Sequence, residues 1–413
     1  MGYQQGLSGL AGASNALDVI GNNIANANTV GFKSSTAQFA DMYANSVATS
    51  VNTQIGIGTT LASVQQQFGQ GTINTTNSSL DVAINGNGFF QMSNNGVTTY
   101  SRDGTFQRDK NGFIVDSQGR NLMGYAAGSG GVINTAQTVP MQAPTTNIAP
   151  TATTKITGQF NLNSQDTVPV KTPFSATDTT TYNYSTSIQV YDSLGGSQAV
   201  NMYFVKSAAG TWEAYAGVQG GATTDLGTVT FNSSGAIQST TTGTPAAPTT
   251  SLGQFQFTVP NTDGSVTPQS LTLDLTGTTQ YGGKDGVNNL AQDGYASGTL
   301  TTYSIGADGK LTGNYSNGQT AVLGLIALAN FNNPNGLVNL GGNQYAESSA
   351  SGVPQISAPG STNHGTLQGS ALENSNVDLT SQLVNLITAQ RNYQANAQTI
   401  KTQQTVDQTL INL

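Results

Sequence analysis

The residues best suited to acid–base or nucleophilic chemistry are few and scattered in this chain of 413 residues. The one histidine, His364, stands among small polar residues in the run STNHGTL. A serine hydrolase would place such a histidine beside an activated serine, but no GxSxG motif occurs, and the lack of cysteine excludes thiolate nucleophiles and cysteine-ligated metals. Zinc needs three or four ligands at recognisable spacing, which this chain does not supply. We therefore predict no catalytic, cofactor-binding or metal-binding residue.

Acidic turns are the nearest approach to a ligand site. Asp109–Gly112 and Asp308–Gly309 are similar to fragments of calcium loops, but the full ligand ladder with its terminal glutamate is missing. Sequence spacing does not exclude a pair of catalytic carboxylates for glycoside hydrolysis, because the two partners are often distant in sequence. However, a carbohydrate-binding cleft usually needs several aromatic side chains, and Trp212 is the one tryptophan in the chain. We predict that the chain is not an enzyme. An extracellular β-rich adhesin or polysaccharide-active enzyme stays as the alternative.

Composition narrows the class of partner. The net charge is −8 and the sequence pI about 4.4, so no basic stripe is present for nucleic acid. The most apolar run, AVLGLIALANF at 321–331, is too short to span a bilayer and predicts a buried strand, so we expect no membrane insertion. Only 8% of the residues are charged, and such a surface suits dense packing against identical copies, where paired charges would have to lose water.

The elements that must position any functional surface are helices at the two ends of the chain, over 1–28 and 378–413. Apolar residues in both recur by threes and fours, and Asp378 or Thr380 is suited to cap the second helix. Each stripe is narrow, so we expect the two helices to pair as a coiled coil. The predicted assembly residues are Leu7, Leu10, Leu17, Ile20, Ile24, Leu379, Leu383, Leu386, Tyr393, Ile400, Val406, Leu410 and Leu413.

The outer face of this helix pair is unusually poor in charge. Between 379 and 413 only Arg391, Lys401 and Asp407 are charged, whereas a solvated helix usually carries many Glu and Lys residues. We therefore expect this face to pack against neighbouring copies or to line a confined space. The alternative is a monomer in which both helices lie on the body of the protein. Gly6, Gly9 and Gly12 lower helix propensity, so the N-terminal helix is expected to be poorly ordered alone.

Between the helices the pattern changes to short alternating runs separated by turn residues. Hairpins are predicted with turns at Asp109–Gly112, Asp192–Gly196 and Asp308–Gly309. The stretch 126–160, rich in Gly, Pro, Ala and Thr, predicts a boundary, and the Thr, Pro and Gly tract at 236–253 predicts a long surface loop. The predicted fold class is mainly β, nested and multi-domain, with the N- and C-terminal helices paired as a coiled coil.

Four stretches carry a resemblance to a known family. LDVIGNNIANANTVGFKSS at 17–35 resembles the N-terminal signature of bacterial flagellar rod and hook proteins, and ALENSNVDLTSQLVNLITAQRNYQANAQTIKTQQTVDQTLINL at 371–413 resembles their C-terminal signature. LDVAINGNGFFQM, followed by YSRDGTFQRDKNGFIVDSQGRNLMGY, is similar to their first β domain. KTPFSATDTTTYNYSTSIQVYDSLGGSQAVNMYFVK at 171–206 resembles the outer domain of flagellar hook proteins. The stretch 207–295 fits the pattern more loosely.

The resemblance implies a nested order of domains. A terminal coiled-coil domain lines a tube and is followed outward by a connecting segment, an inner β domain and an outer β domain. In this sequence their residues would be 1–28 plus 371–413, 29–70 plus 358–370, 71–145 plus 292–357, and 146–291.

The resemblance also implies a function, a location and partners. Hook proteins form a homopolymer, the helical and bendable hook tube of the bacterial flagellum, which lies outside the cell and acts as a universal joint that passes motor torque from rod to filament. The implied partners are the distal rod protein, the hook-filament junction protein, the hook cap protein, the hook-length control protein and the flagellar type III export apparatus. A distal rod-type axial subunit is the alternative within the same families, although such subunits are shorter.

Overall fold

The computed structural model describes residues 2–43, 56–144, 146–242, 247–248 and 251–411. The chain divides into two compact units. Unit 1 contains Met1–Thr145, Thr301–Asn314 and Thr320–Leu413, and unit 2 contains Thr146–Leu300 and Tyr315–Gln319. Unit 2 thus begins inside the stretch 126–160, where composition predicts a boundary. The finer division into four nested domains stays a prediction.

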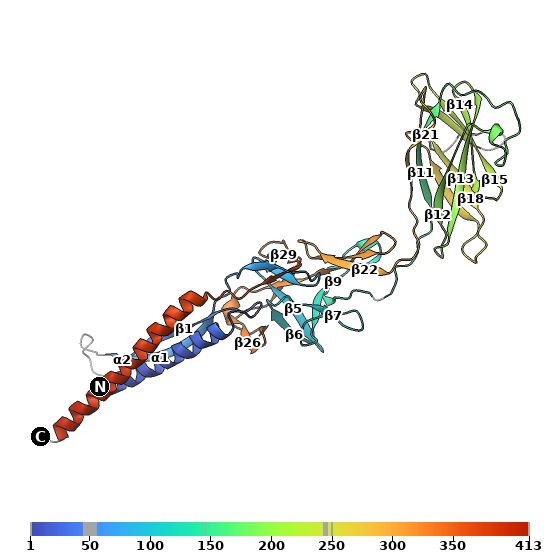
Figure 1. Ribbon diagram of the computed structural model, residues 1–413. Helices are drawn as coiled ribbons and strands as arrows, with labels where there is room; N and C mark the ends of the chain where they lie inside the picture. The colour runs from blue at the N-terminus through green and yellow to red at the C-terminus, as the bar shows by residue number, and fades with distance from the viewer. Residues whose placement is uncertain (1, 44–55, 145, 243–246, 249–250, 412–413) are drawn as a thin grey trace. The chain divides into compact units, whose positions relative to one another are not determined.

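Both ends of the chain are helical, as their apolar spacing predicts. Helix α1 spans Gly2–Ala25 and helix α2 spans Leu379–Ile411. Figure 1 shows α1 in blue beside α2 in red, and the two helices are in contact. The carboxylate of Asp378 accepts hydrogen bonds from the amides of Thr380 (3.0 Å) and Ser381 (3.4 Å), so Asp378 is the cap of α2 and Thr380 is not.

Unit 1 places these helices next to a strand-rich body. A ribbon of two long antiparallel strands, β1 (Ser35–Tyr43) and β2 (Gly56–Gln66), lies against α1. Two short pairs follow, β3 (Ile73–Thr75) with β30 (Ala371–Glu373) and β4 (Val82–Asn85) with β29 (Thr366–Gly369). Each of these two pairs joins a strand from the first part of the chain to one that immediately precedes α2, so the body is closed by both chain ends.

The largest sheet of unit 1 has the strand order β22-β23-β24-β9-β5-β6-β27-β26. Strands β7, β8, β10, β25 and β28 pair alongside this path, and 3-10 turns lie at Ser129–Gly131 and Pro334–Gly336. Its core is a cluster that includes Phe90, Met92, Ile114, Leu311 and Ile326, all fully buried. The strand bounds are β5 (Phe89–Asn94), β6 (Val97–Ser101), β7 (Gln107–Arg108), β8 (Ile114–Val115), β9 (Asn121–Ala126), β10 (Val139–Pro140), β22 (Leu300–Ile305), β23 (Lys310–Tyr315), β24 (Thr320–Ile326), β25 (Leu328–Asn330), β26 (Val338–Gly341), β27 (Gln344–Ala346) and β28 (Gln355–Ser357).

Unit 2 is built from two sheets that share one core. Alternate residues of β11 and β14 are buried, as expected for strands with one face on a core. Phe160, Phe255 and Leu273 of one sheet meet Met202, Phe204 and Trp212 of the other. One sheet contains β11 (Lys155–Asn163), β18 (Gln254–Val259), β19 (Gln269–Asp274), β20 (Thr279–Tyr281) and β21 (Gly286–Gln292), and the other contains β12 (Tyr184–Tyr191), β13 (Ser197–Ala208), β14 (Thr211–Val218), β15 (Thr223–Phe231), β16 (Ile237–Thr242) and β17 (Ala247–Pro248), with a 3-10 turn at Thr179–Thr181.

The three predicted hairpins are confirmed. The turns lie between β7 and β8, between β12 and β13, and between β22 and β23. At the first two, one aspartate organises the turn: Asp109 accepts from the amides of Asn111 and Phe113, and Asp192 accepts from those of Leu194 and Gly196. The carboxylate thus replaces the missing ladder partners of the turn backbone.

Two details of the predicted elements are wrong. The run 321–331 forms two strands rather than one, because the chain leaves β9 after Ile326 and pairs with β5 and β28 from Leu328 onward. The tract 236–253 is partly strand, since β16 and β17 occupy 237–242 and 247–248, while 243–246 and 249–250 lie outside the described residues. Threonine suits a strand, and Thr241 pairs with Thr228 of β15 through their hydroxyls.

The predicted fold class, mainly β with paired terminal helices, is confirmed. In the described part of the chain, no helix has both the length and the apolar character needed to cross a bilayer.

Candidate assembly surface

The interface between α1 and α2 is formed mainly by small side chains. Ala13 and Ala389 are buried there, and Gly6 and Gly9 face α2. A Cβ placed on Gly6 would lie 2.9 Å from Cγ1 of Ile400, and one on Gly9 would lie 2.7 Å from Oδ1 of Asn396. The sequence interpretation of these glycines as helix-weakening residues is therefore incomplete. Their lack of a side chain lets the two helices approach closely.

Alanine at Gly9 is expected to loosen the helix pair, whereas alanine at Gly21 is expected to stabilise α1. Both sites lie within α1, where alanine favours the helix over glycine by about 1 kcal/mol. A Cβ on Gly21 meets nothing within 4 Å, but one on Gly9 must displace Asn396. Amide exchange of α1 in the monomer measures both effects. Slower exchange in Gly9→Ala than in Gly21→Ala would contradict this close packing.

The predicted assembly residues are only partly covered by the helix pair. Leu10, Leu17, Ile20, Ile24, Leu386 and Ile400 are half-buried. Leu7, Leu379, Leu383, Tyr393 and Val406 are between 38% and 53% exposed. The side chain of Leu410, and Leu413 altogether, lie outside the described residues. Pairing of α1 with α2 therefore leaves much of the apolar stripe uncovered within one chain, and the part these residues play in assembly stays a prediction.

Asn23 joins three elements beside this interface and was not predicted. Its side chain is almost fully buried, accepts from the amide of Ser35 (2.9 Å) and donates to the carbonyl of the same residue (2.8 Å). It thereby supplies both ladder partners at the start of β1. Its amide also lies 3.4 Å from Oε1 of Gln382 in α2. One side chain of α1 thus fixes both the ribbon and the second helix.

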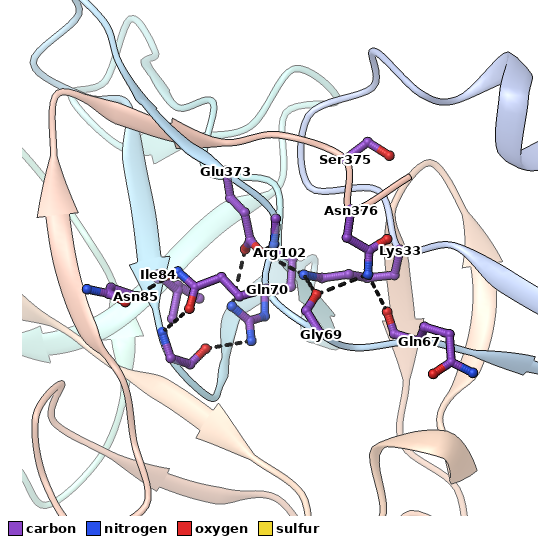
Figure 2. A network of polar contacts seen from close by, with 12 residues as sticks. Lys33, Gln67, Gly69, Gln70, Ile84, Asn85, Arg102, Glu373, Ser375 and Asn376 are labelled. Atoms are coloured by element: carbon purple, nitrogen blue, oxygen red, sulfur yellow. Dashed lines mark hydrogen bonds and ion pairs between the residues drawn. The ribbon is translucent and has the colours of Figure 1, made fainter. Parts of the chain in front are cut away.

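Five passages of the chain meet next to the helices in a polar network, here called the joint, shown in Figure 2. Asn376, just before α2, accepts from the amide of Ser34 (2.8 Å) and donates to the carbonyls of Gln67 (2.7 Å) and Gly69 (3.0 Å). The passages after α1, after β2 and before α2 are therefore held together through their backbones. The joint consists of Lys33, Ser34, Gln67, Gly69, Gly71, Gly86, Arg102, Glu373 and Asn376.

The charged centre of the joint is Glu373. Its Oε1 accepts from Nζ of Lys33 at 2.7 Å and from the amide of Gly71 at 2.8 Å. Its Oε2 accepts from Nη1 of Arg102 at 3.2 Å. The exposed fraction of these three charged side chains is 0% for Lys33 and Glu373 and 3% for Arg102. The pairs therefore lie out of water, where an unpaired charge is far more costly than at the surface.

Two cations share this one carboxylate. Burial lowers the pKa of Lys33, the nearby charge of Arg102 lowers it further, and Glu373 acts in the opposite direction. Burial also lowers the pKa of Arg102, again opposed by Glu373. The remaining donors reach backbone oxygens, Lys33 at Gly69 (2.9 Å) and Arg102 at Gly86 (2.8 Å). Glu373 is therefore the group on which the charged form of both cations depends.

Sequence reasoning missed the joint because its partners lie far apart in the chain, and Lys33 and Glu373 are separated by 340 positions. A signal was nevertheless present. The chain contains only three glutamates, Glu213, Glu347 and Glu373, and the first forty residues contain only two charges, Asp18 and Lys33. Isolated charges in such a sequence are candidates for a specific pair.

His364, which the sequence offered as the one candidate for a catalytic base, makes polar contacts with backbone carbonyls and a serine hydroxyl. The ring of His364 lies 2.9 Å from the carbonyl of Gln355 through Nε2 and 3.0 Å from that of Thr362 through Nδ1. It thus ties the start of β28 to the turn before β29. Over the described residues, no group of three or more His, Asp or Glu side chains is arranged to hold a metal ion.

Comparison with family models covers most of the chain. The N-terminal "Flagella basal body rod protein" model matches 4–33, the "Flagellar hook protein FlgE/F/G D1 domain" matches 83–157, the "Flagellar basal body protein FlaE D2 domain" matches 161–295, and the "Flagellar basal body rod FlgEFG protein C-terminal" model matches 368–413. The flagellar hook protein FlgE of Salmonella typhimurium is 43% identical, with 100% of each chain covered. The chain belongs to the flagellar hook protein family.

Two further relatives, from other bacteria, are also flagellar hook proteins. FlgE of Escherichia coli is 41% identical over 100% of both chains, and FlgE of Treponema pallidum is 31% identical over 99% of this chain and 98% of its own. Among solved structures, the crystal structure of Helicobacter pylori flagellar hook protein FlgE2 matches with a TM-score of 0.48 and 16% identity, covering 73% of this chain and 99% of that one. As a hook-family member, the protein is a structural component of the bacterial flagellar hook.

Proposed function

We propose that copies of this hook-family chain polymerise through their paired terminal helices into a hollow, bendable tube that transmits torque from rod to filament. The observation that carries the proposal is the uncovered apolar stripe on α2. Leu379, Leu383 and Ile387 are each about half exposed, in a helix whose charged residues are only Arg391, Lys401 and Asp407. Because burying apolar area stabilises an assembly by roughly 25 cal/mol per Å², this stripe favours contact with further copies.

The joint supports the torque-bearing part of the proposal. Load applied to either terminal helix passes to the β body through Asn376, Lys33 and Glu373, each bonded to more than one passage of the chain. Head-to-tail contacts whose rotation does not close generate an open helical polymer rather than a ring. In such a tube, helices held by buried contacts resist twist, while more peripheral β units are free to slide as the tube bends.

The specific partners rest on the family relationship alone. They are the distal rod protein, the hook-filament junction protein, the hook cap protein, the hook-length control protein and the flagellar type III export apparatus. The proposal itself depends only on binding between copies of this chain. The protein acts as a structural subunit and not as an enzyme.

Electron microscopy of the purified full chain tests this function. In concentrated kosmotropic salt, which strengthens apolar burial, hollow tubes of uniform diameter are expected. Filament-free solutions or amorphous precipitate over the whole salt range, from protein whose β units are folded, would contradict self-assembly.

A further inference from the structure

The region between α1, α2 and the β1–β2 ribbon is hollowed. Two neighbouring depressions, of about 390 Å³ and about 160 Å³, share Ala16 and Phe39 in their walls. Together they form one feature, here called the small-residue groove, whose helical walls carry small residues between larger and amide side chains. The small residues are Gly9, Gly12, Ala13, Ala16, Ala389 and Ala395, and the others are Val19, Ile20, Gln382, Asn385, Asn392 and Asn396. An enclosed space of about 150 Å³ holds a benzene-sized group, so these two open depressions can receive at least one large side chain.

A complementary feature lies on the same chain. Leu379, Leu383 and Ile387 follow one another at four-residue steps on α2 and form an apolar ridge, with Val384 at its side. At 3.6 residues per turn, this ridge points about 120° away from Ala389, Asn396 and Ile400, whose side faces α1. The helix pair therefore cannot cover its own ridge.

We infer that the apolar ridge of one copy packs into the small-residue groove of the next copy. The inference rests on the proposed self-assembly and identifies the surfaces that make it. Ridges spaced by four residues fit between rows of small residues spaced by three and four, as Gly9, Ala13 and Ala16 are in α1. The groove is continuous with the α1–α2 interface, so an inserted ridge extends a helix contact that already exists.

Charge favours a second copy as the occupant. The residues that line the groove are uncharged, and so are the ridge and every position of α2 from 379 to 390. Contact between two such surfaces removes no charge from water, whereas a basic or acidic partner segment would have to leave its charges unpaired. Ridge and groove are different surfaces, so each copy retains a free groove and a free ridge. Such a contact is heterologous and propagates.

Because the chain lacks cysteine, disulfide crosslinking provides a direct test. The double variant Leu383→Cys with Ala395→Cys is expected to form chains of crosslinked subunits when oxidised in tubes and to remain monomeric when oxidised in dilute solution. Within one copy the two sites are twelve residues apart on α2, about 18 Å, which exceeds the span of a disulfide. Leu383→Cys with Ala16→Cys probes the α1 wall of the groove. Because Ala16 and Gln382 line the same depression within one copy, only crosslinks between subunits, seen as larger species on a denaturing gel, count for this pair.

The matched control is Thr388→Cys with Ala395→Cys, which keeps the groove site but moves the second cysteine to an exposed polar position outside the ridge. Crosslinking above this control in either ridge–groove pair supports the inference. Tubes in which neither pair exceeds the control would overturn it while leaving the proposed self-assembly intact. Absence of tubes from the unmodified chain would instead overturn the self-assembly itself.

A substitution without cysteine tests the inference if the double-cysteine variants fail to assemble. Ala395→Phe fills the groove with a ring and is expected to abolish tubes, whereas Ala11→Phe, at an exposed alanine of α1 that does not line the groove, is expected to leave them. Both chains should retain their monomer fold by circular dichroism. Normal tube formation by Ala395→Phe would overturn the inference.

Discussion

Replacement of Glu373 by glutamine is expected to lower the free energy of unfolding of unit 1 by about 3–5 kcal/mol, the range found when one partner of a buried ion pair is removed. Glutamine keeps the shape of the side chain but leaves Lys33 and Arg102 facing each other out of water without a counter-charge. Whichever way the amide is turned, its NH2 group faces a donor, either that of Arg102 or those of Lys33 and Gly71. Denaturant unfolding, followed by the far-ultraviolet helix signal, measures the change.

The chain provides its own control for this variant. Glu347 is exposed, and its Oε2 lies 3.4 Å from the hydroxyl of Tyr100. Glu347→Gln makes the same chemical change at the surface, where the expected effect is within about 0.5 kcal/mol. Trp212 is fully buried in unit 2, so its fluorescence reports a unit that neither variant alters. Equal stability of the two glutamine variants would contradict the role assigned to the joint.

The charge balance of the joint also predicts which of two substitutions, Lys33→Met or Glu373→Gln, destabilises unit 1 more. Lys33→Met leaves Arg102 paired with Glu373, so no net charge stays buried. We therefore expect Lys33→Met to destabilise unit 1 less than Glu373→Gln does. A packing role alone would predict the opposite order, because methionine removes the polar end of the side chain and glutamine is nearly isosteric with glutamate.

Deletion of residues 383–413 is expected to abolish tube formation at every salt concentration. The deletion removes most of α2, including Leu383 and Ile387 of the ridge and the Ala389 and Ala395 wall of the groove. It leaves Glu373, Asn376 and the cap Asp378 in place, so the joint and the β units are expected to remain folded. Sedimentation and electron microscopy measure assembly, and Trp212 fluorescence reports the fold of unit 2.

The control for the deletion is the chain with its outer α2 face changed but its apolar residues kept, for example Gln398→Ala with Thr402→Ala. Both positions are exposed and lie outside the ridge and the groove. We expect this chain to assemble. Tubes formed by the truncated chain would show that the C-terminal helix is dispensable for polymerisation.

Local chemistry explains which parts of the fold were predictable from sequence. The turns at Asp109 and Asp192 and the cap at Asp378 depend on one carboxylate bonded to amides two to four residues away, so their signals are complete within a short window. The helices were predictable because their apolar spacing repeats over many turns. The division of 321–331 between β24 and β25 was not, since it depends on a change of partner strands far away in the chain.

The same contrast holds within the candidate surface. The stripe containing Leu383 was visible as a periodicity, but the meaning of Gly6 and Gly9 depends on Ile400 and Asn396, nearly 400 residues away. The roles of Asn23, Lys33 and Glu373 likewise depend on pairing between the two chain ends. Helix propensity is a property of a single residue type. The roles of these residues depend instead on contacts with residues at the other end of the chain.

The central claim is that the two ends of the chain pair with each other and are completed by neighbouring copies. A reconstruction of the tube by electron cryomicroscopy, at a resolution that separates helices, tests it most directly. The account predicts α1 and α2 of each copy side by side in the innermost layer, with Leu379, Leu383 and Ile387 covered by an adjoining copy. Helices α1 and α2 lying apart, or the ridge facing open solvent, would contradict it.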